Sequence, residues 1–186
     1  GPVDRLVLEG AVESASIAAL AADVDIVHLS LPGGPQLEAV VDGDDGLLAH
    51  LRAGQTIVDH TTAPYALTRA LGAKAAARGI SYCDAPVART RQAAIDGTLS
   101  IMVGGTVEDV ARVEPLLRCM AEEVSHCGPV GAGQAVKLLN NVLLVQNLNA
   151  VAEAHAIAEG LGLDAAVVLD TLTKGSADSF ALRSHG

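Results

Sequence analysis

The chain has 186 residues, of which 50% are hydrophobic and 18% are charged, and this composition favours a folded protein over a disordered one. Twenty-two acidic residues against twelve basic ones give a net charge of -10, and the chain has two Tyr, one Phe and no Trp, so nucleic acid is excluded as a partner. The most apolar long segment, 134–151, is interrupted by Lys137 and by several Asn and Gln residues, which excludes a membrane-spanning run of about 20 apolar residues.

Apolar runs of strand length alternate with helical patterns through the first 130 residues. This alternation predicts an α/β fold with a Rossmann-like parallel sheet that is covered by helices. The predicted strands are 26–31, 56–59, 80–84, 100–103 and 123–126. The predicted helices are 16–22, 36–41, 46–52, 64–78 and 107–120, with Thr61 and Thr62 as possible caps of the fourth helix and Pro64 in its first turn.

The pattern changes after about residue 130, where strand signals end. A periodic apolar segment predicts one helix over 134–161, about 40 Å long, and a shorter helix over 164–173 follows it. We therefore divide the chain into an incomplete dinucleotide-binding domain, residues 1–130, and a part with an interdomain helix, residues 131–186. One short helix cannot cover the long helix on every side, so we expect either a chain that continues at its C-terminus or a partner subunit.

The cysteines and glycines bear on cofactors and metals. Three cysteines without C-x-x-C spacing predict neither a zinc cage nor a disulfide framework, and they suit the reducing cytoplasm. No acidic or histidine set has metal-ligand spacing, so we expect no metal. The glycine cluster 128–133 precedes the long helix, but Gln134 stands where a P-loop requires Lys, and we interpret the cluster as a strand-to-helix turn.

Lys137 is the first candidate for chemistry. It lies one turn inside the predicted long helix, and Asn140 and Asn141 follow three and four residues later, which places all three on one side. If that side faces a cleft between domains, the ammonium can protonate a developing alkoxide. The alternative is a solvated lysine on a polar stripe, and the spacing does not decide between the two.

The loop after the predicted strand 80–84 is the second candidate, since ligands of open α/β sheets bind beyond the carboxyl ends of strands. Arg89 and Thr90 offer a fork of donors and a hydroxyl that suit an oxyanion, although a solvated arginine is the alternative. The loops 31–34 and 59–62 also follow strands and can line a cofactor or be ordinary turns. His60 lacks a partner at a recognisable spacing for a general base, and His28 is expected to be a satisfied or interface histidine.

The motifs taken in order resemble the β-hydroxyacid dehydrogenases, the family that includes 3-hydroxyisobutyrate dehydrogenase. They span about residues 25–164 and comprise Leu31-Pro32, Asp59-x-Thr61-Thr62, Asp84-x-Pro86-Val87, Gly97-Thr98, Met102-Val103-Gly104-Gly105 and Gly131-x-Gly133-x-x-x-Lys137-x-x-Asn140-Asn141. The resemblance implies a Rossmann domain that binds NAD or NADP, a long interdomain helix and an all-α domain that usually builds a homodimer or a higher homo-oligomer.

The same resemblance assigns roles to residues. It makes Lys137 the catalytic lysine, Asn141 its companion and Asn140 a substrate contact, and it places Leu31, Pro32 and Thr62 against the cofactor. The G-x-G-x-x-G loop and the residue that reads the ribose 2′ position are expected before residue 1, so the choice between NAD and NADP stays open. Further family helices are expected after residue 186.

One departure from the family pattern bears on the substrate. Most members have Ser-Gly-Gly after Asp-x-Pro-Val, whereas this chain has Ala88, Arg89 and Thr90, which resembles the loop of sulfolactaldehyde reductases. That resemblance implies that Arg89 binds a sulfonate, with Ala88 and Thr90 beside it, and that the substrate is a small anionic aldehyde. Carboxylate semialdehydes such as succinic or methylmalonic semialdehyde are the alternative substrates, and a truncated, non-catalytic paralogue that dimerises is the alternative of another class.

Overall fold

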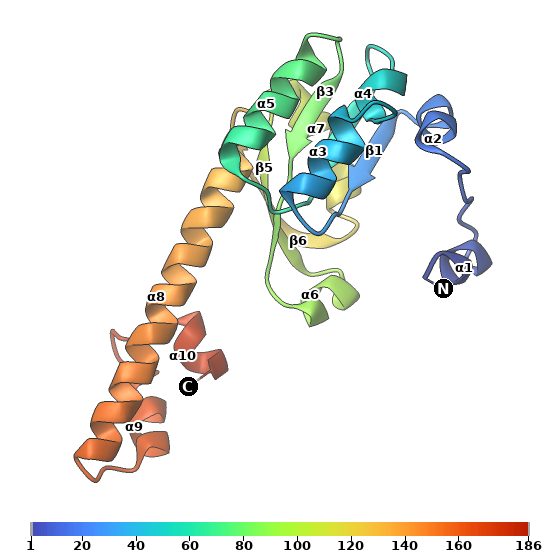
Figure 1. The fold of residues 1–186 in the computed structure, drawn as a ribbon. Helices are drawn as coiled ribbons and strands as arrows, with labels where there is room; N and C mark the ends of the chain where they lie inside the picture. Colours follow the sequence, from blue (N-terminus) through green and yellow to red (C-terminus); the bar gives the residue numbers. More distant parts are fainter. Residues whose placement is uncertain (1, 186) are drawn as a thin grey trace. The chain divides into compact units, whose positions relative to one another are not determined.

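The computed structural model describes residues 2–185. Its chain divides into two compact units, Gly1–Lys137 and Leu138–Gly186, and the boundary falls inside a single helix. The first unit holds a mixed sheet, and the second consists of helices (Figure 1).

The sheet of the first unit has six strands in the order β1-β2-β3-β5-β4, with β6 paired to β5. Three of them, β1 to β3, are parallel and in register, so that Leu29, Asp59 and Asp84 end at the same edge. The strand bounds are β1 Ile26–Leu29, β2 Thr56–Asp59, β3 Ser81–Asp84, β4 Val87–Ala88, β5 Leu99–Gly104 and β6 Ala121–Gly128. Each of the five strands predicted from the sequence is present.

The sheet differs from the expected one in direction and in β4. β5 runs antiparallel to β3 and β4, and β6 is parallel to β5, so the sheet is mixed rather than parallel throughout. For β4 and β5 the length of the connection is the reason, because only the residues 89–98 join these two strands. A parallel return needs a crossover of about a dozen residues or more, whereas a shorter connection brings the chain back antiparallel.

Helices cover both faces of this sheet (Figure 1). On one face Val27, Ile57 and Tyr82 pack with the helices α2 Ile17–Asp23, α3 Gly34–Asp42, α4 Leu47–His50 and α5 Tyr65–Ala76. On the other face Val58, Cys83, Ile101 and Val103 pack with α7 Val107–Leu117 and with Ala93 of α6 Arg91–Asp96. The core therefore lies on both sides of β2 and β3, whose residues alternate between the two faces.

Side chains fix several helix starts. Ser16 caps α2 and Thr106 caps α7, each by accepting a backbone amide hydrogen bond. The helix α5 begins after Pro64 without a side-chain cap, so the prediction that Thr61 or Thr62 caps it is wrong. Thr61 is engaged elsewhere, by the backbone amide of Leu31.

The second unit contains most of α8 Ala132–Gly160, together with α9 Ala165–Leu172 and α10 Phe180–His185. Asp164 caps α9 with two amide hydrogen bonds, as expected. α8 has 29 residues, and large apolar side chains along it are exposed, among them Leu139, Val142 and Leu143.

Across residues 2–185, no helix has both the length and the apolar character needed to cross a membrane. The short helices α1 Pro2–Leu8, α6 and α10 were not predicted.

Candidate active site

The loops that follow β1 and β2 are tied together at the carboxyl edge of the sheet. The Thr61 hydroxyl accepts a hydrogen bond from the Leu31 amide at 3.1 Å. The Thr61 amide donates in turn to the buried Asp59 carboxylate at 2.9 Å, and the Tyr82 hydroxyl donates to the other oxygen of Asp59 at 2.9 Å. The two predicted cofactor loops are therefore held beside each other by a buried side chain.

Asp84, the last residue of β3, fixes the start of α8. One carboxylate oxygen accepts the Gly131 amide at 2.6 Å, and the other accepts the Gln134 amide at 2.8 Å. The side chain is fully buried, and a carboxylate at a helix N-terminus is stabilised by the helix dipole. Burial raises the pKa of Asp84, while the amide hydrogen bonds act in the opposite direction.

Gln134 links the start of α8 to the loop after β2. Its side-chain amide donates to the Thr61 carbonyl at 2.5 Å, and its Oε1 accepts the Ala63 amide at 3.2 Å. Gln134 is fully buried, and both ends of its amide group are paired. We call Asp59, Thr61, Tyr82, Asp84 and Gln134 the strand-end network.

The glycines at the start of α8 permit this close packing. A Cβ on Gly133 would lie 2.4 Å from the Met102 carbonyl oxygen, and a Cβ on Gly104 would lie 2.3 Å from Asp84 Oδ1. The amides of this turn bind Asp84, so the cluster is not a free phosphate cradle. The interpretation of these glycines as a strand-to-helix turn is confirmed.

Lys137 lies in the second turn of α8, just beyond this anchored start. Its side chain is half-buried, and burial lowers its pKa below the ordinary value of 10.5. Its ammonium has no hydrogen-bond partner among residues 2–185. Asn140 and Asn141 lie one turn further along α8, where the Asn140 side chain donates to Asn141 at 3.4 Å. An amine that is partly desolvated and unpaired can exchange a proton with a substrate oxygen.

The loops that follow β1 and β2 contain Leu31, Pro32 and Thr62, the predicted cofactor residues. Thr62 and Pro32 are exposed and Leu31 is half-buried, and the Thr62 hydroxyl has no partner among the described residues. They offer an open hydroxyl and apolar surface at the carboxyl edge of the sheet, where dinucleotides bind in folds of this type.

Arg89 adopts an uncommon backbone conformation. Its φ of 82° is in the left-handed region, and no other non-glycine residue within 2–185 has a positive φ. Its Nη1 donates to the Thr98 carbonyl at 2.6 Å and forms an ion pair with Glu122. Thr90 is the N-cap of α6, and Ala88 is buried in β4. Arg89 contacts Thr98 and Glu122, and no hydrogen bond or ion pair within the described residues joins it to Lys137. Gln134, three residues before Lys137 on α8, bonds to the loop after β2, and Thr61 of that loop bonds to Leu31.

His28 on β1 and His60, the residue after β2, form a pair. The Nδ1 of His28 lies 2.9 Å from the Nε2 of His60, and their rings stack with centroids 5.2 Å apart. The Nδ1 of His60 lies 2.9 Å from the Ala85 carbonyl, which makes it the donor there and leaves its Nε2 to accept from His28. Burial lowers both pKa values, with the opposite histidine adding to the effect on His28.

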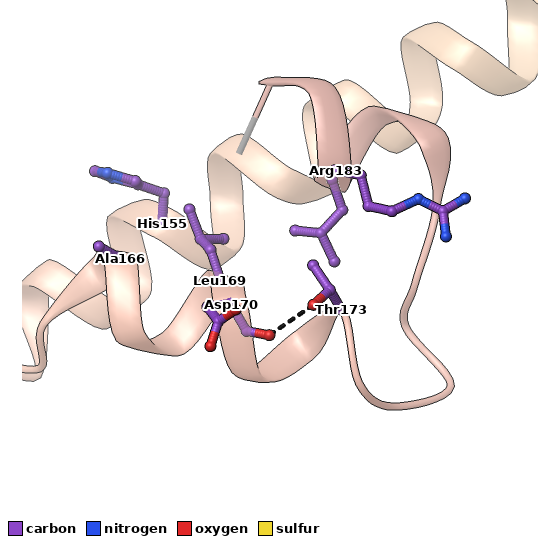
Figure 2. Close-up of a pocket in the computed structure, with 7 residues that line it drawn as sticks. His155, Ala166, Leu169, Asp170, Thr173 and Arg183 are labelled. Atoms are coloured by element: carbon purple, nitrogen blue, oxygen red, sulfur yellow. Dashed lines mark hydrogen bonds between the residues drawn. The ribbon is translucent and has the colours of Figure 1, made fainter.

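A surface pocket of about 620 Å³ lies within the second unit (Figure 2). Side chains from α8, α9 and α10 line it: His155, Ala166, Leu169, Asp170, Thr173, Leu182 and Arg183. Among these residues, the Thr173 hydroxyl donates to the Asp170 carbonyl at 2.7 Å (Figure 2). None of the predicted site residues lines this pocket, and within 2–185 no group of three His, Cys, Asp or Glu side chains gathers as for a metal.

Sequence reasoning missed the residues that position the site. Asp84 bonds to the amides of Gly131 and Gln134, which are 47 and 50 residues away in the sequence, and the Gln134 side chain bonds to Ala63 and Thr61, which are 71 and 73 residues away. No local spacing reveals such pairs. One usable signal was present: a carboxylate that ends a buried strand must find donors, and an unpaired helix N-terminus supplies them. Glu122 gave no signal at all in the sequence.

Two family models match the chain. Residues 1–128 match the NAD-binding domain of 6-phosphogluconate dehydrogenase, and residues 131–186 match the NAD-binding model of NADP-dependent 3-hydroxyisobutyrate dehydrogenase. In Pseudomonas aeruginosa, the NAD-dependent L-serine dehydrogenase is 36% identical over 98% of this chain and 61% of its own length. The 3-hydroxyisobutyrate dehydrogenase of the same organism is 37% identical over 97% of this chain and 60% of its own length.

Solved structures agree with these matches. A Mycobacterium tuberculosis 3-hydroxyisobutyrate dehydrogenase with L-serine has a TM-score of 0.83 and 33% identity, covering 92% of this chain and 58% of that one. The predicted Rossmann-like fold class, with its long helix, is confirmed. The chain spans about 60% of the length of the curated relatives named above. On these grounds the chain belongs to the β-hydroxyacid dehydrogenase family, whose cofactor is NAD or NADP.

Proposed function

We propose that the protein interconverts a small anionic aldehyde and the corresponding hydroxy acid with NAD(H) or NADP(H). The observation that carries the proposal is the half-buried, unpaired Lys137 on a helix whose start is anchored to the strand ends. Leu31, Pro32 and Thr62 would hold the nicotinamide side of the cofactor. Relatives named as 3-hydroxyisobutyrate and 2-(hydroxymethyl)glutarate dehydrogenases support an acid-bearing substrate.

The chemistry needs one hydride and one proton. When bound, a reduced nicotinamide supplies the hydride that a carbonyl carbon accepts. The Lys137 ammonium hydrogen-bonds to the carbonyl oxygen and gives it the proton, which leaves an alcohol and a neutral amine. Asn141, four residues further along α8, orients this ammonium and the substrate, and Asn140 contacts the substrate. In the direction of alcohol oxidation, Lys137 takes the proton back, and its lowered pKa favours that step.

Arg89 and Thr90 would anchor the acid group of the substrate beside Ala88. A charged hydrogen bond contributes about 1.5–3 kcal/mol, so a two-pronged contact can decide which anionic aldehyde is preferred. A guanidinium binds a sulfonate or a carboxylate, so a sulfolactaldehyde-type substrate and a carboxylate semialdehyde both fit this anchor. The positive φ of Arg89 favours a functional role, because a non-glycine residue in this region costs about 1–3 kcal/mol.

The test is turnover of the complete protein with a small anionic aldehyde and NADH or NADPH. The variant Lys137→Ala should lower kcat about 100- to 10,000-fold, the contribution of general acid–base catalysis. Its affinity for the reduced cofactor, measured by fluorescence titration, should be unchanged. The control is Lys74→Ala, since Lys74 is an exposed lysine paired with Asp42, and it should keep full turnover.

Two outcomes would contradict the proposal. Unchanged turnover in Lys137→Ala would remove the lysine from the reaction. A complete protein that binds neither NADH nor NADPH would favour the alternative of a non-catalytic paralogue that dimerises through its helices.

The exposed apolar side chains of α8 support a second copy of the chain as the partner, whether or not the protein is an enzyme. Sedimentation of the complete protein tests that assembly.

A further inference from the structure

Two irregular stretches of backbone meet at the ion pair between Arg89 and Glu122. Arg89 has a φ of 82°, in the left-handed region that favours glycine. In β6, Ala121 pairs with Leu99 and Glu123 pairs with Ser100, so Glu122 is the extra residue of a β-bulge. Bulges re-aim side chains and recur next to active sites. Each partner is therefore directed toward the other by a local departure from regular structure.

The guanidinium is held at one nitrogen. Both contacts of Arg89 involve Nη1, which donates to the Thr98 carbonyl and to the Glu122 carboxylate. The Nε and Nη2 atoms have no partner among residues 2–185. These two atoms form one edge of the planar group, and such an edge matches the two oxygens of a carboxylate or a sulfonate.

The charge of Glu122 has two opposing effects on an incoming anion. It neutralises part of the positive charge of Arg89, which weakens anion binding. It also fixes a flexible side chain in one orientation, which strengthens binding because less entropy is lost when the anion arrives. The side chain of Glu122 is 59% exposed, so water and salt screen its charge. Its carboxylate contacts Nη1 directly, whereas an anion at the Nε–Nη2 edge lies further away, so the repulsion of the anion is screened more than the contact that orients the guanidinium. The orienting effect is the larger one.

We infer that Glu122 is a positioning residue, which with the Thr98 carbonyl holds the Arg89 guanidinium so that its Nε–Nη2 edge receives the acid group of the substrate. This inference rests on the proposed function, since it requires Arg89 to bind the substrate. It adds a determinant of specificity on β6, distant in sequence from the loop that carries Arg89.

The experiment measures KM and kcat of the complete protein for two aldehydes of equal length, one with a terminal sulfonate and one with a terminal hydroxyl. Glu122→Ala should raise KM for the sulfonated aldehyde about two- to fivefold, the range that corresponds to an exposed ion pair. It should leave kcat and the KM for the uncharged aldehyde unchanged. Glu123→Ala is the matched control on the same strand, exposed and adjacent, and should change neither value.

Arg89→Gly supplies the reference. In this background, Glu122→Ala should have no further effect on KM, because the guanidinium that it orients is gone. A fall in KM on Glu122→Ala would mean that Glu122 competes with the substrate. Equal changes in KM for both aldehydes would mean that Glu122 has a structural role. Either result overturns the inference.

The Arg89→Gly variant also separates this inference from the proposed function. If Arg89→Gly itself leaves the KM for the sulfonated aldehyde unchanged, the substrate anchor of the proposed function is wrong as well. If Arg89→Gly raises it and Glu122→Ala does not, only the role of Glu122 is wrong.

Discussion

The strand-end network differs from the cluster of Arg89, Thr98 and Glu122, which we call the Arg89 corner, in how its polar side chains are buried and paired. In the network, Asp84 and Gln134 are fully buried, and their polar atoms are paired with backbone groups. At the Arg89 corner the partners are exposed, and the guanidinium is paired at one nitrogen. Buried paired groups fix a geometry, whereas exposed groups with free donors can meet a ligand. The first region therefore fixes the start of α8, and the second leaves donors for the acid group that we propose it binds.

The comparison predicts its largest effect at Asp84. Asp84→Ala leaves the buried amides of Gly131 and Gln134 without partners, at about 1–3 kcal/mol each, so the free energy of unfolding should fall by about 2–6 kcal/mol. Urea denaturation of the complete protein measures this change. The control is Asp25→Ala, an exposed carboxylate just before β1, which should stay within about 0.5 kcal/mol. Equal losses in the two variants would show that the network does not anchor α8.

Arg89→Gly should separate binding from stability. Loss of a charged two-pronged contact should raise the KM for an anionic aldehyde at least about tenfold. The free energy of unfolding should stay level or rise by about 1 kcal/mol, because glycine adopts a positive φ without strain while the exposed ion pair contributes little. Steady-state kinetics and urea denaturation on the same preparation check both parts. A large loss of stability would place Arg89 in the structural group with Asp84.

The pH dependence tests the burial of Lys137. Burial lowers its pKa below 10.5, so kcat for alcohol oxidation should rise with pH and reach half of its plateau below that value. In the reducing direction, kcat should fall over the same range, because the ammonium is then the acid. The variant Lys137→Arg cannot lose its proton in this range and should abolish oxidation. A midpoint at or above 10.5 would contradict a desolvated amine.

The smallest predicted effect concerns the histidine pair. The pKa values of His28 and His60 lie below 6.5 in the folded chain, so the unfolded chain binds protons first as the pH falls. Stability should therefore be full above about pH 6.5 and should decrease below it, by about 2 °C in Tm for each kcal/mol lost. The decrease between pH 7.5 and pH 5 should be smaller in His60→Gln than in the parent.

The sequence was a good guide to local elements and a poor one to distant pairs. The strand 56–59 was predicted at its observed bounds, and the long helix was placed within two residues at its start and one at its end, because both rest on local apolar patterns. The antiparallel direction of β5 and the existence of β4 were missed, since they depend on how a short connection returns to the sheet. The short helices α1, α6 and α10 carry too few residues for a periodic signal.

The candidate site divides in the same way. Lys137, Asn141 and the strand-end loops follow strands or lie on one helix, so their order in the sequence gives their placement. Their roles, the division into domains 1–130 and 131–186, and the cytoplasmic location stay predictions. The partners of Asp84 and Gln134 depend on tertiary packing that no local pattern contains. Glu122 reaches Arg89 only because a bulge turns it, and a bulge is a property of strand pairing.

The two glycines that touch Asp84 and the adjacent backbone have a consequence for recognising related proteins. Any side chain at Gly104 or Gly133 would push α8 away from the sheet and carry Lys137 with it, since each Cβ would stand within 2.4 Å of an oxygen atom. A lysine at the aligned position is therefore weak grounds for transferring an activity between distant sequences. A lysine that occurs together with both glycines and the aspartate is better evidence, because these four residues fix the position of the start of α8, and with it that of the lysine, relative to the strand ends.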